Sequence, residues 1–329
     1  MTARILVAIG ICLAGVSMFA QGRGAAQAPP TDTAAPGIPG VVAAGTPVHV
    51  IKDGFNGSEG PIALPDGSVI FSETTANRTI KIDPTGAIST FLENTGGANG
   101  MSFDSDGRLF ATHVPYGATK VSIIYPKGKE ALIVDNYQGK PFGRVNDLTV
   151  AKNGAIYFTD SANPAPPPPT PLPLPPAFYY LAPGSKTAVQ VLNDVAFPNG
   201  VVLSRDEKTL FLNNTNGEYL IAFDVKPDGS LTNRRNFAQY KGVTKNASGA
   251  MVSGADGITI DNEGRLYVAT AIGVQVFSPQ GQHLGTIELS RAPQNLAFAG
   301  KDKKTLYVVG RGVAFQVQML AQGFTGRAK

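Results

Sequence analysis

Apolar and polar positions alternate over short stretches along most of the chain, as they do in β-strands that bury one face. The clearest unit covers residues 255–269. There an alternating strand carries Ile258 and Ile260, an Asn-Glu-Gly turn follows, and a second strand begins at Leu266. This pattern predicts a β-hairpin whose first strand is preceded by an oxygen-bearing side chain, Asp256.

The same hairpin pattern recurs along the chain about every 50 residues, a period that is typical of propeller blades. Each copy opens with an acidic or amide side chain. These opening residues are Glu59, Asn99, Asn146, Asn199, Asp256 and Asn295. Most copies continue with a third alternating stretch, a turn and a fourth stretch. The pattern therefore predicts an all-β fold, a six-bladed β-propeller with four-stranded antiparallel blades.

The alternating stretch at residues 48–51 belongs to no repeat, and the sixth repeat reaches the chain end with few strands. We expect this N-terminal strand to complete the last blade and close the ring, because closure removes a sheet edge. The propeller domain is then predicted to span residues 46–322, followed by a tail at 323–329.

The N-terminal segment has the features of a secretory leader. Residues 1–28 combine Arg4, a largely apolar run from 5 to 20 and an Ala-Gln-Ala sequence at 26–28, which predicts a cleaved signal peptide. A retained membrane anchor is the alternative, but the run is shorter than the ~20 residues of a spanning helix. We therefore expect a periplasmic or secreted protein without membrane contact after cleavage.

Composition changes this picture little. The 329 residues are 43% hydrophobic and 16% charged, as in folded globular proteins. Residues 29–45, rich in Pro, Ala, Gly and Thr, predict a flexible linker.

Cys12, the one cysteine, lies in the leader, so the mature chain has no disulfide. Cleavage removes Arg4 and Arg23, which lowers the net charge from +4 to 26 − 24 = +2. No basic run indicates nucleic acid.

The opening side chains predict a cation site. The first strand of each propeller blade lines the axis, so these side chains should converge at one mouth, together with the loops between second and third strands. Carboxylates and amide oxygens without Cys or His suit Ca²⁺ better than zinc. The alternative is a set of simple turns, since Asn-Gly at 99 and 199 is a common tight bend, but turns do not require Glu59.

Several short motifs stand at these openings. They are Ser58-Glu59-Gly60-Pro61, Arg144-Val145-Asn146-Asp147, Phe197-Pro198-Asn199-Gly200 and Asp256-Gly257, with further motifs at 281–285 and 295–298. As a set they resemble the gluconolactonase, senescence marker protein and luciferin-regenerating enzyme family over about residues 55–310. The resemblance implies a propeller lactonase that uses a divalent cation, usually Ca²⁺.

The resemblance also implies roles for individual residues. It implies that Glu59, Asn199 and Asp256 hold the metal, with Asn146 as a fourth ligand or near neighbour, and that Arg144 contacts substrate. In lactone hydrolysis a cation polarises the carbonyl while a carboxylate takes a proton from water. Asp256 is the predicted base, with Glu59 or a metal-bound hydroxide as alternatives. The predicted substrate contacts are Arg144, Asn146, His113 and Asn99.

A proline-rich segment at residues 163–176 falls in the loop between the second and third strands of the third blade. We expect a stiff polyproline lid over the metal mouth; an exposed spacer or partner-binding segment is the alternative.

The favoured function is an exported hydrolase that opens a sugar lactone, with a small lactone or ester as substrate and Ca²⁺ or another divalent cation as cofactor. A phosphotriesterase that uses the same site is one alternative. A non-catalytic, calcium-bound propeller that acts as a binding module is another. The sequence does not indicate an oligomeric state.

Overall fold

The computed structural model describes residues 28–164, 167 and 170–327. The predicted signal peptide therefore lies outside the described residues except for Ala28. All regular elements in the described ranges are β-strands. None of these residues forms a helix long and apolar enough to cross a membrane.

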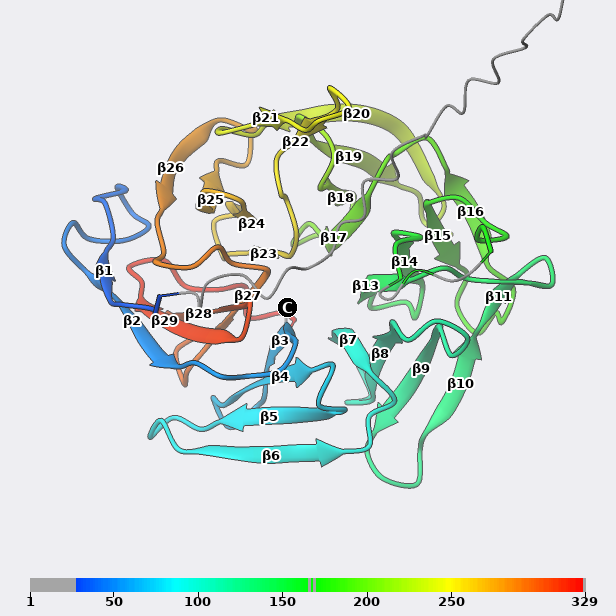
Figure 1. The fold of residues 1–329 in the computed structure, drawn as a ribbon, viewed down its shortest axis with the longest axis horizontal. Coiled ribbons are helices and arrows are strands. Elements are labelled where there is room, and N and C mark those ends of the chain that lie inside the picture. The colour runs from blue at the N-terminus through cyan, green and yellow to red at the C-terminus, as the bar shows by residue number, and fades with distance from the viewer. Residues whose placement is uncertain (1–27, 165–166, 168–169, 328–329) are drawn as a thin grey trace, which may run out of the picture.

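Five four-stranded sheets and one five-stranded sheet stand around a central axis in chain order (Figure 1). Blade 1 contains β3 (Ser58–Ala63), β4 (Val69–Glu73), β5 (Arg78–Ile82) and β6 (Ile88–Glu93), and blade 2 contains β7 (Ala98–Phe103), β8 (Leu109–His113), β9 (Lys120–Tyr125) and β10 (Ala131–Val134). Blade 3 contains β13 (Val145–Val150), β14 (Ile156–Asp160), β15 (Ala177–Leu181) and β16 (Val189–Leu192), and blade 4 contains β17 (Pro198–Leu203), β18 (Thr209–Asn214), β19 (Tyr219–Val225) and β20 (Leu231–Gln239). The predicted six-bladed propeller is confirmed.

The last two blades and two small hairpins complete the fold. Blade 5 contains β23 (Ile258–Ile260), β24 (Leu266–Thr270), β25 (Gly273–Phe277) and β26 (His283–Ile287), and blade 6 contains β27 (Asn295–Ala299), β28 (Thr305–Gly310), β29 (Val313–Gln318), β2 (Pro47–Lys52) and β1 (Thr33–Ala34). The hairpins pair β11 (Asn136–Tyr137) with β12 (Lys140–Pro141) and β21 (Thr244–Lys245) with β22 (Met251–Val252).

The core consists of apolar layers between neighbouring blades. In β14, Phe158 packs with Phe110 of blade 2, whereas the preceding residue, Tyr157, packs with Val201 of blade 4. Successive side chains of a strand point to opposite faces, so each blade buries both of its faces. Each fully buried side chain of this kind stabilises the fold by about 1.5–3 kcal/mol.

The N-terminal strand closes the ring as predicted. Strand β2 pairs antiparallel with β29, with Val48 opposite Val317, and β1 then pairs with the outer edge of β2. The first and last parts of the chain thus share one sheet. This arrangement makes the sixth blade depend on residues from both ends of the propeller domain.

Residues 29–45 form an ordered segment, where their composition predicts a flexible linker. Ile38, Val41 and Val42 are buried in the same apolar cluster as blades 5 and 6. The carbonyl oxygen of Val41 also accepts hydrogen bonds from the backbone amides of Leu320 and Ala321. The segment is ordered because its few apolar residues, which follow no helical or strand period, cover the outer part of the closed ring.

The C-terminal tail also packs against the propeller. The amide of Phe324 donates to the carbonyl oxygen of Ile260 at 3.1 Å, and the Arg327 guanidinium pairs with Glu207 of blade 4 at 3.2 Å. The described part of the tail therefore packs across blades 4 and 5.

The proline-rich segment at 163–176 connects β14 to β15. Its described part includes Leu174, which is buried in the core between blades 2 and 3. This contact fixes one end of the segment to the propeller, and its role as a lid stays a prediction.

Candidate active site

The opening residues stand at one end of the inner strands of the propeller. Glu59, Asn99, Asn146, Asn199 and Asn295 lie at the starts of β3, β7, β13, β17 and β27, and Asp256 precedes β23. Hydrogen bonds connect them between blades. Asn99 Nδ2 donates to Asn146 Oδ1 at 3.1 Å, and Asn295 Nδ2 donates to Glu59 Oε2 at 3.2 Å. The oxygen-bearing side chains therefore form a ring at one mouth of the axis.

Glycines after the opening residues allow this close approach. A Cβ atom at Gly60 would lie 2.0 Å from the carbonyl oxygen of Asn99, and one at Gly200 would lie 2.2 Å from that of Asp256. Both distances are far below van der Waals contact, so a side chain at either position would push two blades apart. The glycines that follow Glu59 and Asn199 therefore allow neighbouring strands to come together at the axis.

Glu59 is buried at this mouth, and both of its carboxylate oxygens accept hydrogen bonds. Oε1 accepts from Gln294 Nε2 at 3.1 Å and Oε2 from Asn295 Nδ2 at 3.2 Å. Burial raises the pKa of Glu59, and the charge of Asp147 adds to that effect, while the hydrogen bond from Asn295 opposes it. The two amides therefore orient the carboxylate and partly offset the cost of burying its charge.

The backbone of Asp256 is held in place, but its carboxylate is not. Its amide donates to Ala269 O at 2.9 Å, and its carbonyl oxygen accepts from Asn213 Nδ2 at 2.5 Å. Tyr240 OH in turn donates to Asn213 Oδ1 at 2.8 Å. Among the described residues, no group donates a hydrogen bond to the Asp256 carboxylate. Burial and then repulsion from Glu59 raise its pKa well above the ordinary value.

Asn199 supplies an unpaired oxygen at the same mouth. The residue is only 3% exposed, and its Nδ2 donates to Thr215 Oγ1 at 3.0 Å. Its Oδ1 is buried without a hydrogen-bond partner among the described residues. A buried acceptor left unpaired is costly, so this oxygen is available to a ligand or ion at the mouth.

The donor set fits a hard divalent cation. Within the described ranges, no three His, Cys, Asp or Glu side chains are close enough to hold a metal ion, so a cation here would depend on amide oxygens as well as carboxylates. Glu59, Asn199 and Asp256 offer that mixture, and Asn146 adds a further amide oxygen. Oxygen ligands of mixed charge are those that Ca²⁺ prefers.

Asn99 and Asn146 have different surroundings. The Asn99 amide bridges its neighbours, since Nδ2 donates to Asn146 and Oδ1 accepts from Thr74 Oγ1 at 3.3 Å. The Asn146 backbone is fixed by Thr112, whose hydroxyl donates to Asn146 O at 2.6 Å. Asn99 thus orients Asn146, which is a more direct role for it than the predicted substrate contact.

Arg144 is directed at the mouth by its loop. Its positive charge lowers the pKa values of both Glu59 and Asp256. The loop is held by Asp160, which is fully buried and accepts backbone hydrogen bonds from Gly143, Arg144 and Ala162 at 2.7–2.8 Å. This places Arg144 where the sequence predicts a substrate contact, and Asp160 is a positioning residue that the sequence did not indicate.

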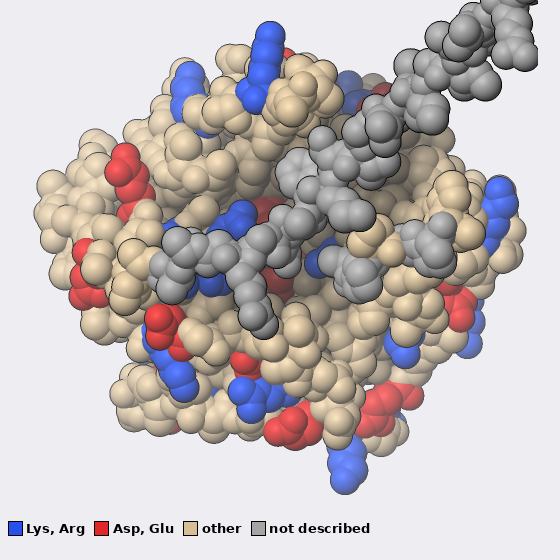
Figure 2. All heavy atoms as spheres, in the orientation of Figure 1, with Lys and Arg blue, Asp and Glu red and all other residues tan. Residues whose placement is uncertain are grey.

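A second arginine near the mouth, Arg311, was not predicted from the sequence, and a third carboxylate, Asp147, lies there as well. The charge of Arg311, in the turn between β28 and β29, lowers the pKa of Asp256. Asp147 is buried, and its Oδ2 accepts from the amide of Val201 at 3.3 Å. The sequence contained a signal for Arg311, because it follows the second strand of a blade. Figure 2 shows basic and acidic side chains together in the hollow at the disc centre.

His113 does not have the free ring nitrogen that a substrate contact needs. Its Nδ1 is 3.0 Å from Gly96 O and its Nε2 is 2.7 Å from Ser122 Oγ. Burial lowers the pKa of His113 to about 4. The residue therefore acts within blade 2 as a neutral, hydrogen-bonded side chain.

The fold and this mouth define a six-bladed propeller with an oxygen-lined axial site. Residues 57–311 match the model of the SMP-30/Gluconolactonase/LRE-like region, so the chain belongs to that family.

Individual relatives agree with this assignment. A gluconolactonase from Zymomonas mobilis is 27% identical over 297 residues, which cover 83% of this chain and 81% of the relative. A solved gluconolactonase from Xanthomonas campestris is 26% identical with a TM-score of 0.73, over 88% of this chain and 95% of that one. The calcium-binding regucalcin of Agrobacterium tumefaciens shares the fold at 18% identity and a TM-score of 0.69, over 84% of this chain and 95% of that one.

Proposed function

We propose that this protein is a metal-dependent hydrolase that opens a sugar lactone. One observation carries the proposal. Asn199 Oδ1 and the Asp256 carboxylate stand at the same mouth, and neither accepts a hydrogen bond from the described residues. Membership of the gluconolactonase-like family supports it, as does the similarity to named gluconolactonases.

Four residues would hold the cation, namely Glu59, Asn146, Asn199 and Asp256. Calcium is the metal that we propose, because two carboxylates and two amides form a hard, moderately charged ligand set. When bound, the cation stabilises the negative charge that develops on the lactone carbonyl oxygen. Glu59 is suited to a ligand role, since both of its oxygens are already oriented by hydrogen bonds.

Asp256 is the proposed general base. Its carboxylate accepts no hydrogen bond from the described residues, so an oxygen that does not hold the cation would be available to accept a proton. In this role it accepts a proton from the water that attacks the lactone carbonyl. Breaking the ring C–O bond then releases the hydroxy acid, with the proton delivered to the leaving alkoxide.

Arg144 and Arg311 are the proposed substrate-binding cations. Both are donors only, so they suit the hydroxyl and carbonyl oxygens of a sugar lactone. Their positive charges lower the pKa of Asp256 and so oppose the effect of its burial. Asp160 accepts a hydrogen bond from the backbone amide of Arg144 and so fixes the backbone position from which the guanidinium side chain extends.

The test is hydrolysis of glucono-1,5-lactone, followed with a pH indicator, by protein with calcium, with chelator, and with calcium restored. The proposal expects turnover that stops with chelator and returns with calcium. Turnover of a phosphotriester without turnover of the lactone would support the phosphotriesterase alternative. A folded, calcium-loaded protein that hydrolyses neither substrate would be a binding module.

We also propose that the protein is exported. The support is the leader-like sequence at residues 1–28, together with the ordered segment that begins directly after it. Thr31, for example, donates its amide to Ser290 Oγ at 3.0 Å. N-terminal sequencing of the protein recovered from the periplasm or medium should find a start close to residue 29, and an intact Met1 would contradict export by cleavage.

A further inference from the structure

A cavity of about 1010 Å³ lies at the opposite end of the inner strands from the candidate active site. Its lining includes Leu64, which directly follows β3, whereas Glu59 stands near the start of that strand. Five residues of extended chain separate the two positions by roughly 16 Å. The cavity is therefore distinct from the metal mouth.

One wall of this cavity is apolar and aromatic. The rings of Phe91 and Tyr125 lie 5.2 Å apart at 46°, and Leu64 and Phe103 join them at the edge of the core between blades 1 and 2. All four side chains are only partly buried. A concave apolar lining of this size is typical of small-molecule sites.

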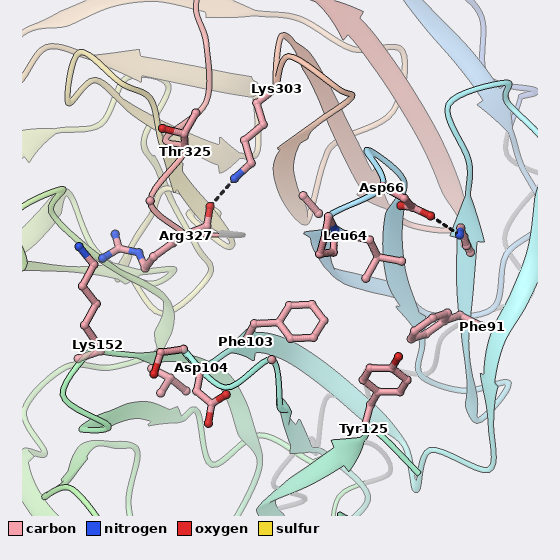
Figure 3. Close-up of a pocket in the computed structure, with 18 residues that line it drawn as sticks. Leu64, Asp66, Phe91, Phe103, Asp104, Tyr125, Lys152, Lys303, Thr325 and Arg327 are labelled. Atoms are coloured by element: carbon pink, nitrogen blue, oxygen red, sulfur yellow. Dashed lines mark hydrogen bonds and ion pairs between the residues drawn. The ribbon is translucent and has the colours of Figure 1, made fainter.

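The opposite wall is formed by the C-terminal tail and by turns from blades 3 and 6. Figure 3 shows the side chains of Lys152, Lys303 and Arg327 across the cavity from the rings of Phe103 and Tyr125. One side of the cavity thus presents cationic side chains and the other presents rings.

The two acids that line this cavity are neutralised by ion pairs, Asp66 with Lys81 at 2.7 Å and Asp104 with Arg108 at 2.6 Å. Glu207, outside the lining, pairs with Arg327 at 3.2 Å. Each acid in the set has a cation within direct contact. None of them is therefore left to neutralise the remaining lysines of the wall.

Lys152 and Lys303 are the cations without an acidic partner. The Lys152 ammonium has neither an ion pair nor a hydrogen bond within the described part of the chain. The Lys303 ammonium donates only to the backbone carbonyl oxygens of Phe324 and Arg327. Burial lowers the pKa of Lys303 to about 8, so most of it stays protonated at pH 7. Among the described residues, the lining of the cavity therefore carries a net positive charge beside an aromatic wall.

We propose that this cavity binds a small aromatic carboxylate. The ring system lies against Phe103 and Tyr125, and the carboxylate pairs with Lys152 and Lys303. Residues 325–327 of the tail line the same cavity, so the ligand contacts the tail and the blades together. The site is separate from the hydrolase site and does not depend on the function proposed for it.

The test uses 2-naphthoate as the probe and its fluorescence as the readout. The chain has no tryptophan, so the naphthyl signal is excited with little protein background. We expect saturable binding to one site per chain. We expect Lys152→Ala to raise the Kd about fivefold and Lys152→Arg to leave it within about twofold, because a charge contact of this kind is worth a modest amount. Neutral methyl 2-naphthoate should bind more weakly.

Two further variants separate this site from other binding. Phe103→Ala should raise the Kd about tenfold through the loss of ring contact, whereas Arg144→Ala, at the other mouth, should leave it unchanged. Lactone hydrolysis by Lys152→Ala should equal that of the unsubstituted protein. Non-saturable binding, a Kd that is unchanged by both Lys152→Ala and Phe103→Ala, or a Kd raised by Arg144→Ala would overturn the proposal.

Discussion

Asn295 in blade 6 donates its Nδ2 to Oε2 of Glu59 in blade 1 at 3.2 Å, across 236 positions of sequence. This bond joins the last blade to the first at the candidate active site. On the outside of the ring, β2 joins the same two regions by pairing with β29. The contacts between the last and first blades therefore both close the propeller and orient the Glu59 carboxylate.

Asn295→Ala should weaken calcium binding. The substitution removes one of the two donors to Glu59 Oε2 and leaves that oxygen with the Gly60 amide alone, at 3.2 Å, at a cost of about 1 kcal/mol. We expect the calcium concentration for half-maximal lactone hydrolysis to rise about tenfold. Asn236→Ala, in the exposed part of β20, is the matched control. Equal calcium dependence in the two variants would contradict the role given to Asn295.

Asp160→Ala should reduce both stability and substrate affinity. The carboxylate accepts three backbone hydrogen bonds around Arg144, so its loss should cost about 3 kcal/mol in urea unfolding. We also expect KM for the lactone to rise, because the Arg144 loop is released. Asp194→Ala, which breaks an exposed ion pair with Arg234, should cost less than about 1 kcal/mol. A KM unchanged in Asp160→Ala would show that this carboxylate does not position Arg144.

His113 should make stability depend on pH between about 6.5 and 4. Its pKa in the folded protein is about 4, so the unfolded chain takes up a proton first as pH falls through this window. The stability contributed by neutral His113 is present above pH 6.5 and is lost by pH 4, to the extent of about 3 kcal/mol. Urea unfolding of His113→Gln at several pH values should lack this component, and parallel profiles would contradict the prediction.

The ordered segment at 29–45 should contribute to the stability of the propeller. Ile38 is buried against blade 5, where a Cβ at Gly285 would lie 2.7 Å from its Cδ1. Ile38→Ala should cost about 2–4 kcal/mol through the cavity that it leaves. Val189→Ala, at a side chain that is 53% exposed, should be close to neutral. Thermal unfolding of the two variants checks this, and equal melting temperatures would mean that the segment is detached in solution.

The sequence was sufficient for the blades because most strands carry their own alternation and many of the turns contain Gly or Pro. It also placed the ring-closing strand, since 48–51 belongs to no repeat. The order of 29–45 could not be predicted, because Ile38, Val41 and Val42 follow no period and become buried only against the closed ring.

The candidate site was also predictable in part. The opening residues could be named because they recur at one position of a repeat. The partners Asp160 and Thr112 could not, since they contact the mouth residues through bonds between blades or across a loop. His113 is the opposite case. Its position in the repeat suggested that it faces the mouth, but both of its ring nitrogens form hydrogen bonds at blade 2.

The central claim is that Glu59, Asn146, Asn199 and Asp256 bind one divalent cation that lactone hydrolysis requires. The most direct measurement is calcium titration by calorimetry of the unsubstituted protein and of Asn199→Leu, paired with glucono-1,5-lactone hydrolysis in the same buffers. We predict one calcium site per chain, activity that follows its occupancy, and loss of both in Asn199→Leu while the protein stays folded. Full hydrolysis by calcium-free protein, or unchanged calcium affinity in folded Asn199→Leu, would contradict the account.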